Sequence, residues 1–462
     1  VILTDKLTPQ QVLPTLQKHM LADGFGDIVC DPVKSQGAIL HDMLHDRDYI
    51  DLFTFFASSP IGYNHPHLTS PEFLKKLGRI AVNKTSNSDI YTVEMAEFVE
   101  TFVRVAMPDY MKYLFFVCGG GLAVENAMKT AFDWKTKQNL QRGIWTDDAE
   151  AQAKEDELVI IHFRQAFHGR TGYTLSVTNT DDARKYKYFP KFDWPRISSP
   201  GINFSLPEPE RWEFCAVEEE RAVAEIRRAI ALNPNKVAAI LIEPIQAEGG
   251  DRHFRTEFHK WLRELADEAE ALLIHDEVQT GFGLTGRFWA SEHYDVRPDI
   301  ICFGKKSQVC GIIVGDRLDT VKYHVFSDEA DETGAVPGGS RLNSTWGGNL
   351  VDMVRCQAYL EVIEEEKLVD NAAAVGTHLL TGLYDALEGT PGTAARGVGL
   401  MMAFDLPTAE MRNEAHGKLL ENGLFTITCG PRSIRFRPPL ILTRELADKS
   451  LDIVHETLKK MG

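Results

Sequence analysis

Two adjacent lysines, Lys305 and Lys306, follow an apolar run in the segment DIICFGKKSQVCG (299–311). Such a run predicts a buried strand, and lysine is seldom buried without a reason. A lysine in a partly desolvated site has a lowered pKa and can act as a Schiff-base nucleophile. Neighbouring residues of an extended segment point to opposite sides. Only one of the two lysines can therefore face a ligand, and local chemistry alone does not choose between them.

Three glycines (119–121) separate the apolar run YLFFV (113–117) from a helical stretch. Glycines at such a junction let backbone N–H groups approach an anion, and a helix N-terminus adds positive partial charge. A phosphate site and an ordinary tight strand–helix turn explain these glycines equally well. The run matches neither GxGxxG nor the Walker A pattern, so dinucleotides and nucleoside triphosphates are not indicated.

Two further motifs place polar side chains directly after apolar runs. In LLIHDEVQTG, Asp276 needs a cationic or hydrogen-bonding partner. It could cap the next segment or pair with a protonated ring nitrogen, and Gln279 could reach the same ligand. In QAFHGRTGY, Phe167 could stack on a flat ring, His168 could contact it, and Arg170 could clamp a carboxylate. On its own, this second motif is more typical of an ordinary loop.

The elements that must position these residues alternate between short apolar runs and longer amphipathic stretches. One stretch carries its apolar residues at helical spacing, which predicts a helix with one buried face. Continuous apolar strands separated by helices predict a mainly parallel sheet covered on both faces, with ligands bound beyond the carboxyl ends of the strands. The apolar runs lie at 113–117, 158–163, 237–245, 271–278 and 299–304, and the helical residues are Phe254, Phe258, Trp261, Leu262 and Leu265.

Composition limits the class of protein. The chain has 462 residues, is 44% hydrophobic and 25% charged, and carries a net charge of -17, which argues against nucleic-acid binding. Its seven cysteines form no CxxC pair, which favours free thiols in a reducing cytoplasm. No apolar run reaches the length of a membrane span, and the first residues do not resemble a signal peptide. The segment NHPH (64–67) is expected to be a rigid loop, and no metal is expected.

The candidate residues converge on one cofactor. A phosphate cradle, a carboxylate, a stacking aromatic ring and a lysine all lie at the predicted carboxyl ends of strands. A planar, cationic, phosphorylated aldehyde would use each of them. Pyridoxal 5'-phosphate has that chemistry.

The chain resembles the class III aminotransferases among the fold-type I pyridoxal-phosphate enzymes, over roughly residues 51–440. The motifs, in the family's order, are FHGRT, EPIQAEGG, LLIHDEVQTGFGLTGRFWA, PDIICFGKK, NSTWGGN and IRFRPPL. The resemblance implies an α/β large domain (75–346) with a mainly parallel seven-stranded sheet covered by helices. It also implies a smaller α+β domain from the N-terminal (1–74) and C-terminal (347–462) segments.

The resemblance assigns roles to single residues. Lys305 would form the Schiff base with the cofactor. The residues Gly120, Gly121, Phe167, His168, Asp276 and Gln279 would bind the cofactor, together with Thr345 from the other subunit of a homodimer. Arg170 and Asn343 would contact the substrate, with Arg170 on its α-carboxylate. Glu248 would cover Arg435, or alternatively Arg437, and swing aside for a second carboxylate. Lys306 would then point towards solvent or a carboxylate.

Within this family the segments FFVCGGGLAVENAMKTAFDWK, YFPKFDWPRI and GKKSQVCG are most similar to bacterial L-lysine 6-aminotransferases. We therefore expect transfer of the terminal amine of L-lysine to 2-oxoglutarate, giving 2-aminoadipate 6-semialdehyde and L-glutamate. The 4-aminobutyrate aminotransferases share a similar FDWP and lysine pair, so a 4-aminobutyrate or other ω-amine aminotransferase is the first alternative. An aminomutase or racemase on the same cofactor, and a non-catalytic pyridoxal-phosphate regulator, are the others.

Overall fold

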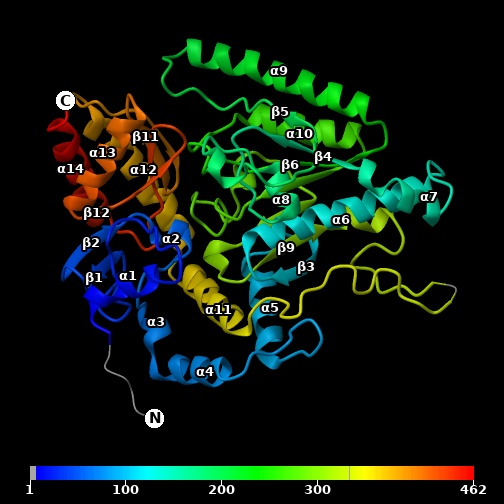
Figure 1. The fold of residues 1–462 in the computed structure, drawn as a ribbon, viewed down its shortest axis with the longest axis horizontal. Coiled ribbons are helices and arrows are strands. Elements are labelled where there is room, and N and C mark those ends of the chain that lie inside the picture. Colours follow the sequence, from blue (N-terminus) through cyan, green and yellow to red (C-terminus); the bar gives the residue numbers. More distant parts are fainter. Residues whose placement is uncertain (1–6, 332) are drawn as a thin grey trace.

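A seven-stranded sheet forms the centre of the chain (Figure 1). The computed structural model describes residues 7–331 and 333–462. Strands β8, β7, β6, β4 and β5 run parallel, and β9 lies antiparallel between β3 and β8. In order across the sheet, the strands are β3 (Met111–Val117), β9 (Cys310–Gly315), β8 (Ile300–Phe303), β7 (Leu272–Asp276), β6 (Val237–Ile242), β4 (Val159–Phe163) and β5 (Arg196–Ile197).

The mainly parallel sheet agrees with the prediction, and the five apolar runs become β3, β4, β6, β7 and β8. Strand β9 was not predicted. It follows shortly after the two lysines and runs antiparallel to β8. As a result, β3 runs in the same direction as β8, although the two are not neighbours. The carboxyl ends of β3, β4, β6, β7 and β8 therefore all lie at one edge of the sheet.

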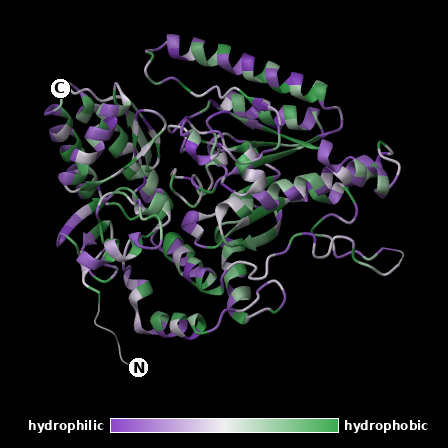
Figure 2. Ribbon diagram, viewed as in Figure 1, coloured by the Kyte–Doolittle hydropathy of each residue, from purple (hydrophilic) through white to green (hydrophobic). Residues whose placement is uncertain are grey.

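Helices cover both faces of this sheet because its strands are apolar on both sides (Figure 2). Along β6, Ala239 and Leu241 pack in the cluster that contains α6 (Gly120–Gln141), whereas Ile240 and Ile242 pack towards α10 (Thr256–Glu268). Helix α9 (Glu210–Leu232) lies outside α10. The predicted amphipathic helix is α10, and Phe254 precedes its first turn.

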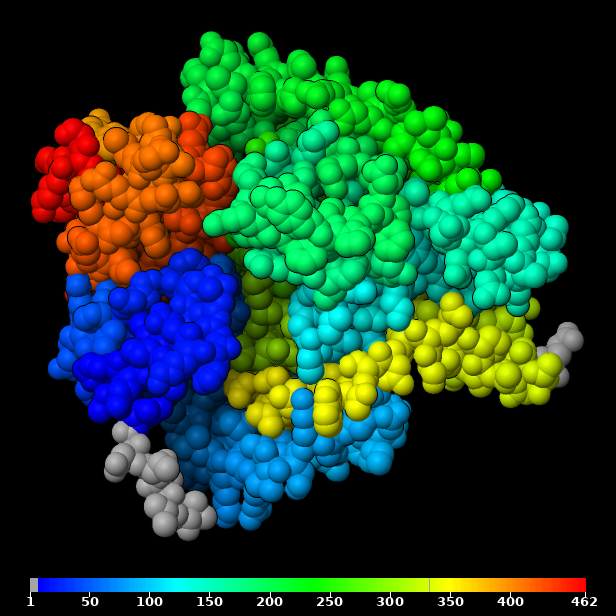
Figure 3. Space-filling model, viewed as in Figure 1, coloured from blue at the N-terminus to red at the C-terminus, as the bar shows by residue number. Residues whose placement is uncertain are grey.

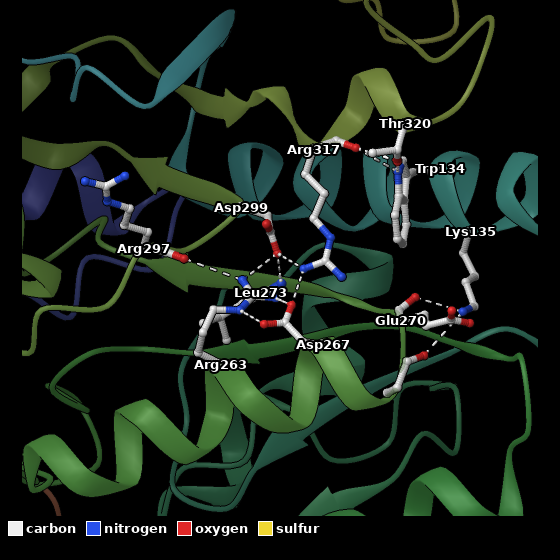
Figure 4. A network of polar contacts seen from close by, with 11 residues as sticks. Trp134, Lys135, Arg263, Asp267, Glu270, Leu273, Arg297, Asp299, Arg317 and Thr320 are labelled. Carbon is white, nitrogen blue, oxygen red and sulfur yellow. Dashed lines mark hydrogen bonds and ion pairs between the residues drawn. The ribbon is translucent and has the colours of Figure 1, made fainter.

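A polar network anchors the opposite end of the sheet, at the amino ends of β7 and β8 (Figure 4). Asp299 accepts hydrogen bonds from the backbone N–H of Leu273 (2.7 Å) and from Arg263 (2.8 Å), and Arg317 joins Asp267 to the same group. The two arginines balance the two aspartates, and their ion pairs connect α10 to the sheet. The network therefore accounts for stability at this end, and the chemistry of the site lies at the other end.

The N-terminal and C-terminal segments share a sheet. Strands β1 (Ile39–Asp42), β2 (Arg47–Asp51) and β12 (Leu424–Phe425) form one sheet, with β2 in the middle. The remaining sheet has the order β10 (Thr393–Val398), β11 (Met401–Asp405), β14 (Ser433–Phe436) and β13 (Ile427–Cys429). The domain boundaries at residues 74 and 347 stay predictions. The first falls within α4 (Pro71–Ala81), and the second shortly precedes α11 (Leu350–Glu365).

Several helices complete the chain around these sheets. Helix α5 packs on α11, and α12 packs on α14, so the C-terminal helices join the small sheets to the large one. None of the helices in the described part of the chain is long and apolar enough to cross a membrane. The other helices of eight or more residues are α1 (Pro9–Gln17), α5 (Val93–Val105), α12 (Leu368–Leu387), α13 (Ala409–Glu421) and α14 (Arg444–Lys459). The short ones are α2 (Thr54–Ala57), α3 (Pro66–Thr69), α7 (Asp148–Ala153) and α8 (Gly172–Val177).

Candidate active site

The glycine segment between β3 and α6 forms a close-fitting turn. Gly119 has φ 114°, a conformation that favours glycine, and α6 begins at the next residue. A Cβ on Gly120 would lie 2.8 Å from a Cγ atom of Val278, and a Cβ on Gly169 would lie 2.7 Å from the Cα of Gly121. Side chains at these two glycines would collide with neighbouring protein atoms, so the segments around the helix N-terminus can pack this closely only with glycine. The turn thus presents backbone N–H groups and positive partial charge where an anion could approach.

Asp276 is the last residue of β7 and is held by two donors. One carboxylate oxygen accepts from the backbone N–H of Val278 (3.1 Å), and the other lies 2.8 Å from Nδ1 of His168. His168 is buried and follows β4, so the ring lies against the carboxylate. The structure therefore places His168 behind Asp276, where it can orient the carboxylate that would meet a ring nitrogen.

Lys305 follows β8 at the same edge of the sheet. Burial lowers the pKa of Lys305, the carboxylates of Asp276 and Glu243 raise it, and the guanidinium of Arg435 lowers it further. The residue has φ 53°, a conformation that is strained for a side chain other than glycine and that often occurs at functional sites. The lysine is therefore a less protonated amine than usual, held among the charged groups of the site.

The prediction that Lys306 points towards solvent or a carboxylate is wrong. Its side chain is buried, and Nζ donates to the backbone carbonyl of Gln279 (2.7 Å). Burial, followed by repulsion from Lys305 and Arg437, holds the pKa of Lys306 well below its usual value. The prediction assumed an extended backbone, but residues Lys305–Ser307 form a 3-10 turn that directs both lysines inwards. Lys306 thus supports the backbone of Gln279.

The side chain of Gln279 lies between two buried arginines of the C-terminal segment. Its amide oxygen accepts from Nη1 of Arg435 (3.1 Å) and from Nε of Arg437 (3.0 Å). The amide nitrogen is therefore the group that can donate to a ligand. Arg435 also pairs with Glu248, with 2.7 Å between Nη2 and Oε2, whereas Arg437 pairs with Asp251. The structure thus selects Arg435, rather than Arg437, as the partner of Glu248.

Phe167 and Arg170 lie on the loop after β4. Lys185, which contacts Glu248, lies 5.8 Å from the centre of the Phe167 ring. The guanidinium carbon of Arg170 is 5.9 Å from the centre of the Phe167 ring, and the Arg170 side chain is exposed. Phe167 is fixed by its backbone N–H, which donates to the carboxyl group of Glu243 (2.9 Å). The ring and the guanidinium are thus neighbours at the open side of the site.

Three residues that the sequence argument missed support this site. Glu243 follows β6, binds the backbone N–H groups of Phe167 and Ala247, and has its pKa raised to about 7, chiefly by burial. Asp251 pairs with Arg437, and Lys185 pairs with Glu248. The motif EPIQAEGGD contains Glu243 and Asp251, and its strand-end position was the available signal for both. The sequence offers no corresponding signal for Lys185.

Asn343 and Thr345 lie apart from these groups within the chain, on an exposed segment. The backbone carbonyl of Thr345 accepts from the hydroxyl groups of Ser86 (2.6 Å) and Ser88 (3.3 Å). Residues 333–346, yellow in Figure 1, run outside the compact body, and Figure 3 shows them on its surface. Any contact that these two residues make with an active site is therefore expected at a subunit interface.

The described part of the chain contains no cluster of three or more histidine, cysteine or acidic residues that could hold a metal ion. Within the NHPH segment, His65 lies 3.1 Å from Glu366 and His67 lies 3.8 Å from Glu361. Each imidazole thus pairs with a separate carboxylate of the helical region after residue 350.

The geometry fits pyridoxal phosphate. The turn at 119–121 leaves backbone N–H groups open to a phosphate, Asp276 offers a buried carboxylate to a ring nitrogen, and Phe167 lies at the open side. Lys305 supplies an amine of lowered pKa at the same edge. Each functional group of the cofactor therefore has a complementary partner among these residues.

Comparison with known proteins gives concordant results. Residues 20–458 match the family model described as aminotransferase class III. The L-lysine-epsilon aminotransferase of Mycobacterium tuberculosis is 48% identical over 454 residues, which is 98% of this chain and 96% of that protein. A solved structure described as lysine aminotransferase from M. tuberculosis in the internal aldimine form has a TM-score of 0.90 and 45% identity, covering 99% of this chain and 100% of that one. A 4-aminobutyrate aminotransferase of Dictyostelium discoideum is 31% identical, covering 93% and 85% of the two chains.

Proposed function

The chain belongs to the class III aminotransferases, and from this premise we propose that it transfers the terminal amine of L-lysine to 2-oxoglutarate. The products are 2-aminoadipate 6-semialdehyde and L-glutamate. The observation that carries the proposal is the ion pair between Glu248 and Arg435, 2.7 Å long, at the edge of the sheet that holds Lys305. A covered arginine lets one site accept first an amine and then a second carboxylate.

Pyridoxal phosphate is the cofactor of this site. Gly120 and Gly121 would hold its phosphate at the N-terminus of α6, together with Thr345 of the partner subunit. Phe167 would lie against the ring, and the amide nitrogen of Gln279 would donate to the ring oxygen. Asp276, oriented by His168, would accept from the ring nitrogen. When bound, the cofactor supplies an aldehyde that takes up and returns an amino group, and a ring that withdraws electrons.

Lys305 would hold the cofactor and serve as the base that moves a proton in each half of the reaction. Its amine, of lowered pKa, would take a proton from Cε of the bound lysine and later give it back. Arg170 and Asn343 bind the α-carboxylate end of the substrate. Since the α-carboxylate is held at the mouth of the site, the far amine of lysine reaches the reacting position.

The second half of the reaction requires a different arrangement of charge. 2-Oxoglutarate brings two carboxylates, and the second needs Arg435, which Glu248 covers while lysine is bound. An uncovered, fully buried arginine would be costly without a partner. Glu248 therefore pairs with Arg435 in the lysine half and moves aside in the acceptor half.

The active unit is a homodimer in the cytoplasm. Apolar residues at the start of α5 and just before it are strongly exposed, with Ile90 at 69%, Tyr91 at 75% and Val93 at 71%. This segment adjoins Ser86 and Ser88, which bind the backbone of Thr345. Apolar surface of this kind is typical of a protein interface. All seven cysteines are free thiols, which fits a reducing compartment.

The test is a product assay with the purified, cofactor-loaded protein. With L-lysine and 2-oxoglutarate, we expect glutamate and a six-carbon semialdehyde, seen as its cyclised imine by mass spectrometry. Turnover of 4-aminobutyrate without turnover of lysine would refute the proposal in favour of an ω-amine aminotransferase. Conversion of lysine without any oxo-acid acceptor would refute it in favour of an isomerase.

A further inference from the structure

Glu248 has two cationic partners, which lie on opposite sides of its carboxylate. Oε2 is 2.7 Å from Nη2 of Arg435, and Oε1 contacts Nζ of Lys185. Arg435 comes from β14 and is fully buried, whereas Lys185 ends a short turn (Ala183–Lys185) after α8. The side chains of Lys185 and Glu248 retain 17% and 21% exposure. Glu248 is therefore shared between a buried, fixed cation and a more flexible one near the surface.

This sharing bears on the movement of Glu248. Burial raises the pKa of Glu248, and the charges of Arg435 and Lys185 outweigh that effect and lower it. If Arg435 were the only partner, moving Glu248 aside would leave a largely buried carboxylate without a counter-ion, which is strongly unfavourable. With Lys185 already on the other oxygen, Glu248 can leave Arg435 and keep a counter-ion.

Space for the displaced carboxylate exists on the Lys185 side. A cavity of about 190 Å³ adjoins both side chains and is also lined by Arg412 and Gly430. Arg412 donates to the carbonyl of Gly430 (3.2 Å), and the N–H of Gly430 donates to the carbonyl of Glu248 (2.9 Å). Asp181, Asp182 and Arg184 line the cavity as well, and Asp182 is paired with Arg184 (2.8 Å). The cations left to meet a carboxylate that rotates into this cavity are Lys185 and Arg412.

We propose that Lys185 is a specificity-determining positioning residue, which holds Glu248 when the second carboxylate of the acceptor occupies Arg435. This inference rests on the proposed function and extends it to a residue outside the cofactor site. Lys185 lowers the cost of exposing Arg435, so it favours the acceptor half of the reaction. It contributes less to the lysine half, in which Glu248 stays on Arg435.

The test compares Lys185→Met with Lys185→Arg, and uses Lys187→Met as a matched control. Lys187 is exposed and lies two residues away on the same loop, over the ring of Tyr188. The two half-reactions are followed separately by rapid mixing, and binding of glutarate, a non-reacting dicarboxylate, is measured by the shift in thermal unfolding temperature. For Lys185→Met we expect about tenfold weaker use of 2-oxoglutarate and about tenfold weaker glutarate binding, equivalent to about 1.4 kcal/mol. The lysine half should change less than threefold, and Lys185→Arg should restore most of the loss.

A Glu248→Gln background separates this role from direct contact with the acceptor. If Lys185 acts through Glu248, adding Lys185→Met to Glu248→Gln should change glutarate binding less than twofold. A loss that persists in that background, an equal loss in both halves, or the same loss in Lys187→Met would overturn the proposal. Failure of the wild-type protein to use lysine would instead refute the proposed function, because the variants are compared with the wild type in the lysine half of the reaction.

Discussion

Two buried arginines near the site should respond very differently to loss of their acidic partners. Arg437 and Asp251 are both completely buried and joined by two hydrogen bonds, one of them 3.0 Å long. Arg435 is equally buried, but its partner Glu248 is 21% exposed. Removing one member of a fully buried pair leaves an uncompensated charge and costs about 3–5 kcal/mol. We therefore expect the Arg437 pair to be structural and the Arg435 pair to be able to open.

The perturbation is the matched pair Asp251→Asn and Glu248→Gln, each of which removes one charge and keeps the shape. Asparagine also tolerates the positive φ of residue 251 (48°), so backbone strain does not enter the comparison. For Asp251→Asn we expect a loss of about 3 kcal/mol in the free energy of unfolding. For Glu248→Gln we expect about 1 kcal/mol, because Arg435 keeps the amide oxygen of Gln279 as an acceptor.

The assay is urea unfolding of cofactor-saturated protein at one fixed subunit concentration, with the slope of each transition checked for constancy. Glu248→Gln should alter the acceptor half of the reaction more than the lysine half. Asp251→Asn should alter both, since Arg437 also holds the side chain of Gln279. Equal destabilisation by the two substitutions, or a cost below 1 kcal/mol for Asp251→Asn, would contradict the distinction between a structural and an opening pair.

Two further predictions concern the lysines and Glu243. Lys305→Ala should abolish the absorbance band of the bound cofactor and lower turnover by about 10²–10⁴-fold or more, whereas Lys306→Met should retain the band and lose about 1 kcal/mol of stability with its hydrogen bond to Gln279; the opposite pattern of the band would refute the assignment. Glu243 has a pKa of about 7 in the folded protein and an ordinary value in the unfolded chain, so the folded state binds more protons between those values. The contribution of Glu243 to the free energy of unfolding of cofactor-free protein should therefore fall by about 3 kcal/mol at most as pH rises from about 5 to 7, and the difference between the wild type and Glu243→Gln in a urea series across pH should show it. A difference between the two proteins that does not change with pH would contradict the assignment to Glu243.

The fold class was predictable because its signals are local. Each of the five apolar runs is long enough to indicate a strand buried on both faces, and the alternation with helices predicts parallel strands. Strand β9 was missed because its residues, Cys310–Gly315, follow so closely on the lysines. Its antiparallel pairing with β3 joins segments almost 200 residues apart, although its pairing with β8 is local.

The residues of the site also divide into those that local sequence predicts and those that only the tertiary structure reveals. Asp276, Lys305, Gly120 and Phe167 could be identified from sequence because each follows an apolar run, and the carboxyl ends of such strands meet at one edge. Strand-end position is a property of the chain within about ten residues, and it needs no knowledge of what packs opposite. The sequence by itself thus determined the fold and the chemistry of the cofactor, and it predicts the main cofactor-facing groups.

Only the tertiary structure decided which charges pair. Arg435 lies in β14 and Arg437 directly follows that strand, and the approach of the Glu248 loop assigns Arg435 to Glu248 and Arg437 to Asp251. Lys306 is buried because a 3-10 turn replaces the extended backbone that the sequence suggested. The partnership of Lys185 with Glu248 joins segments 63 residues apart. The energy of an ion pair depends on the distance between the charges and on the local dielectric, so it depends on ångström-scale placement that no local pattern encodes.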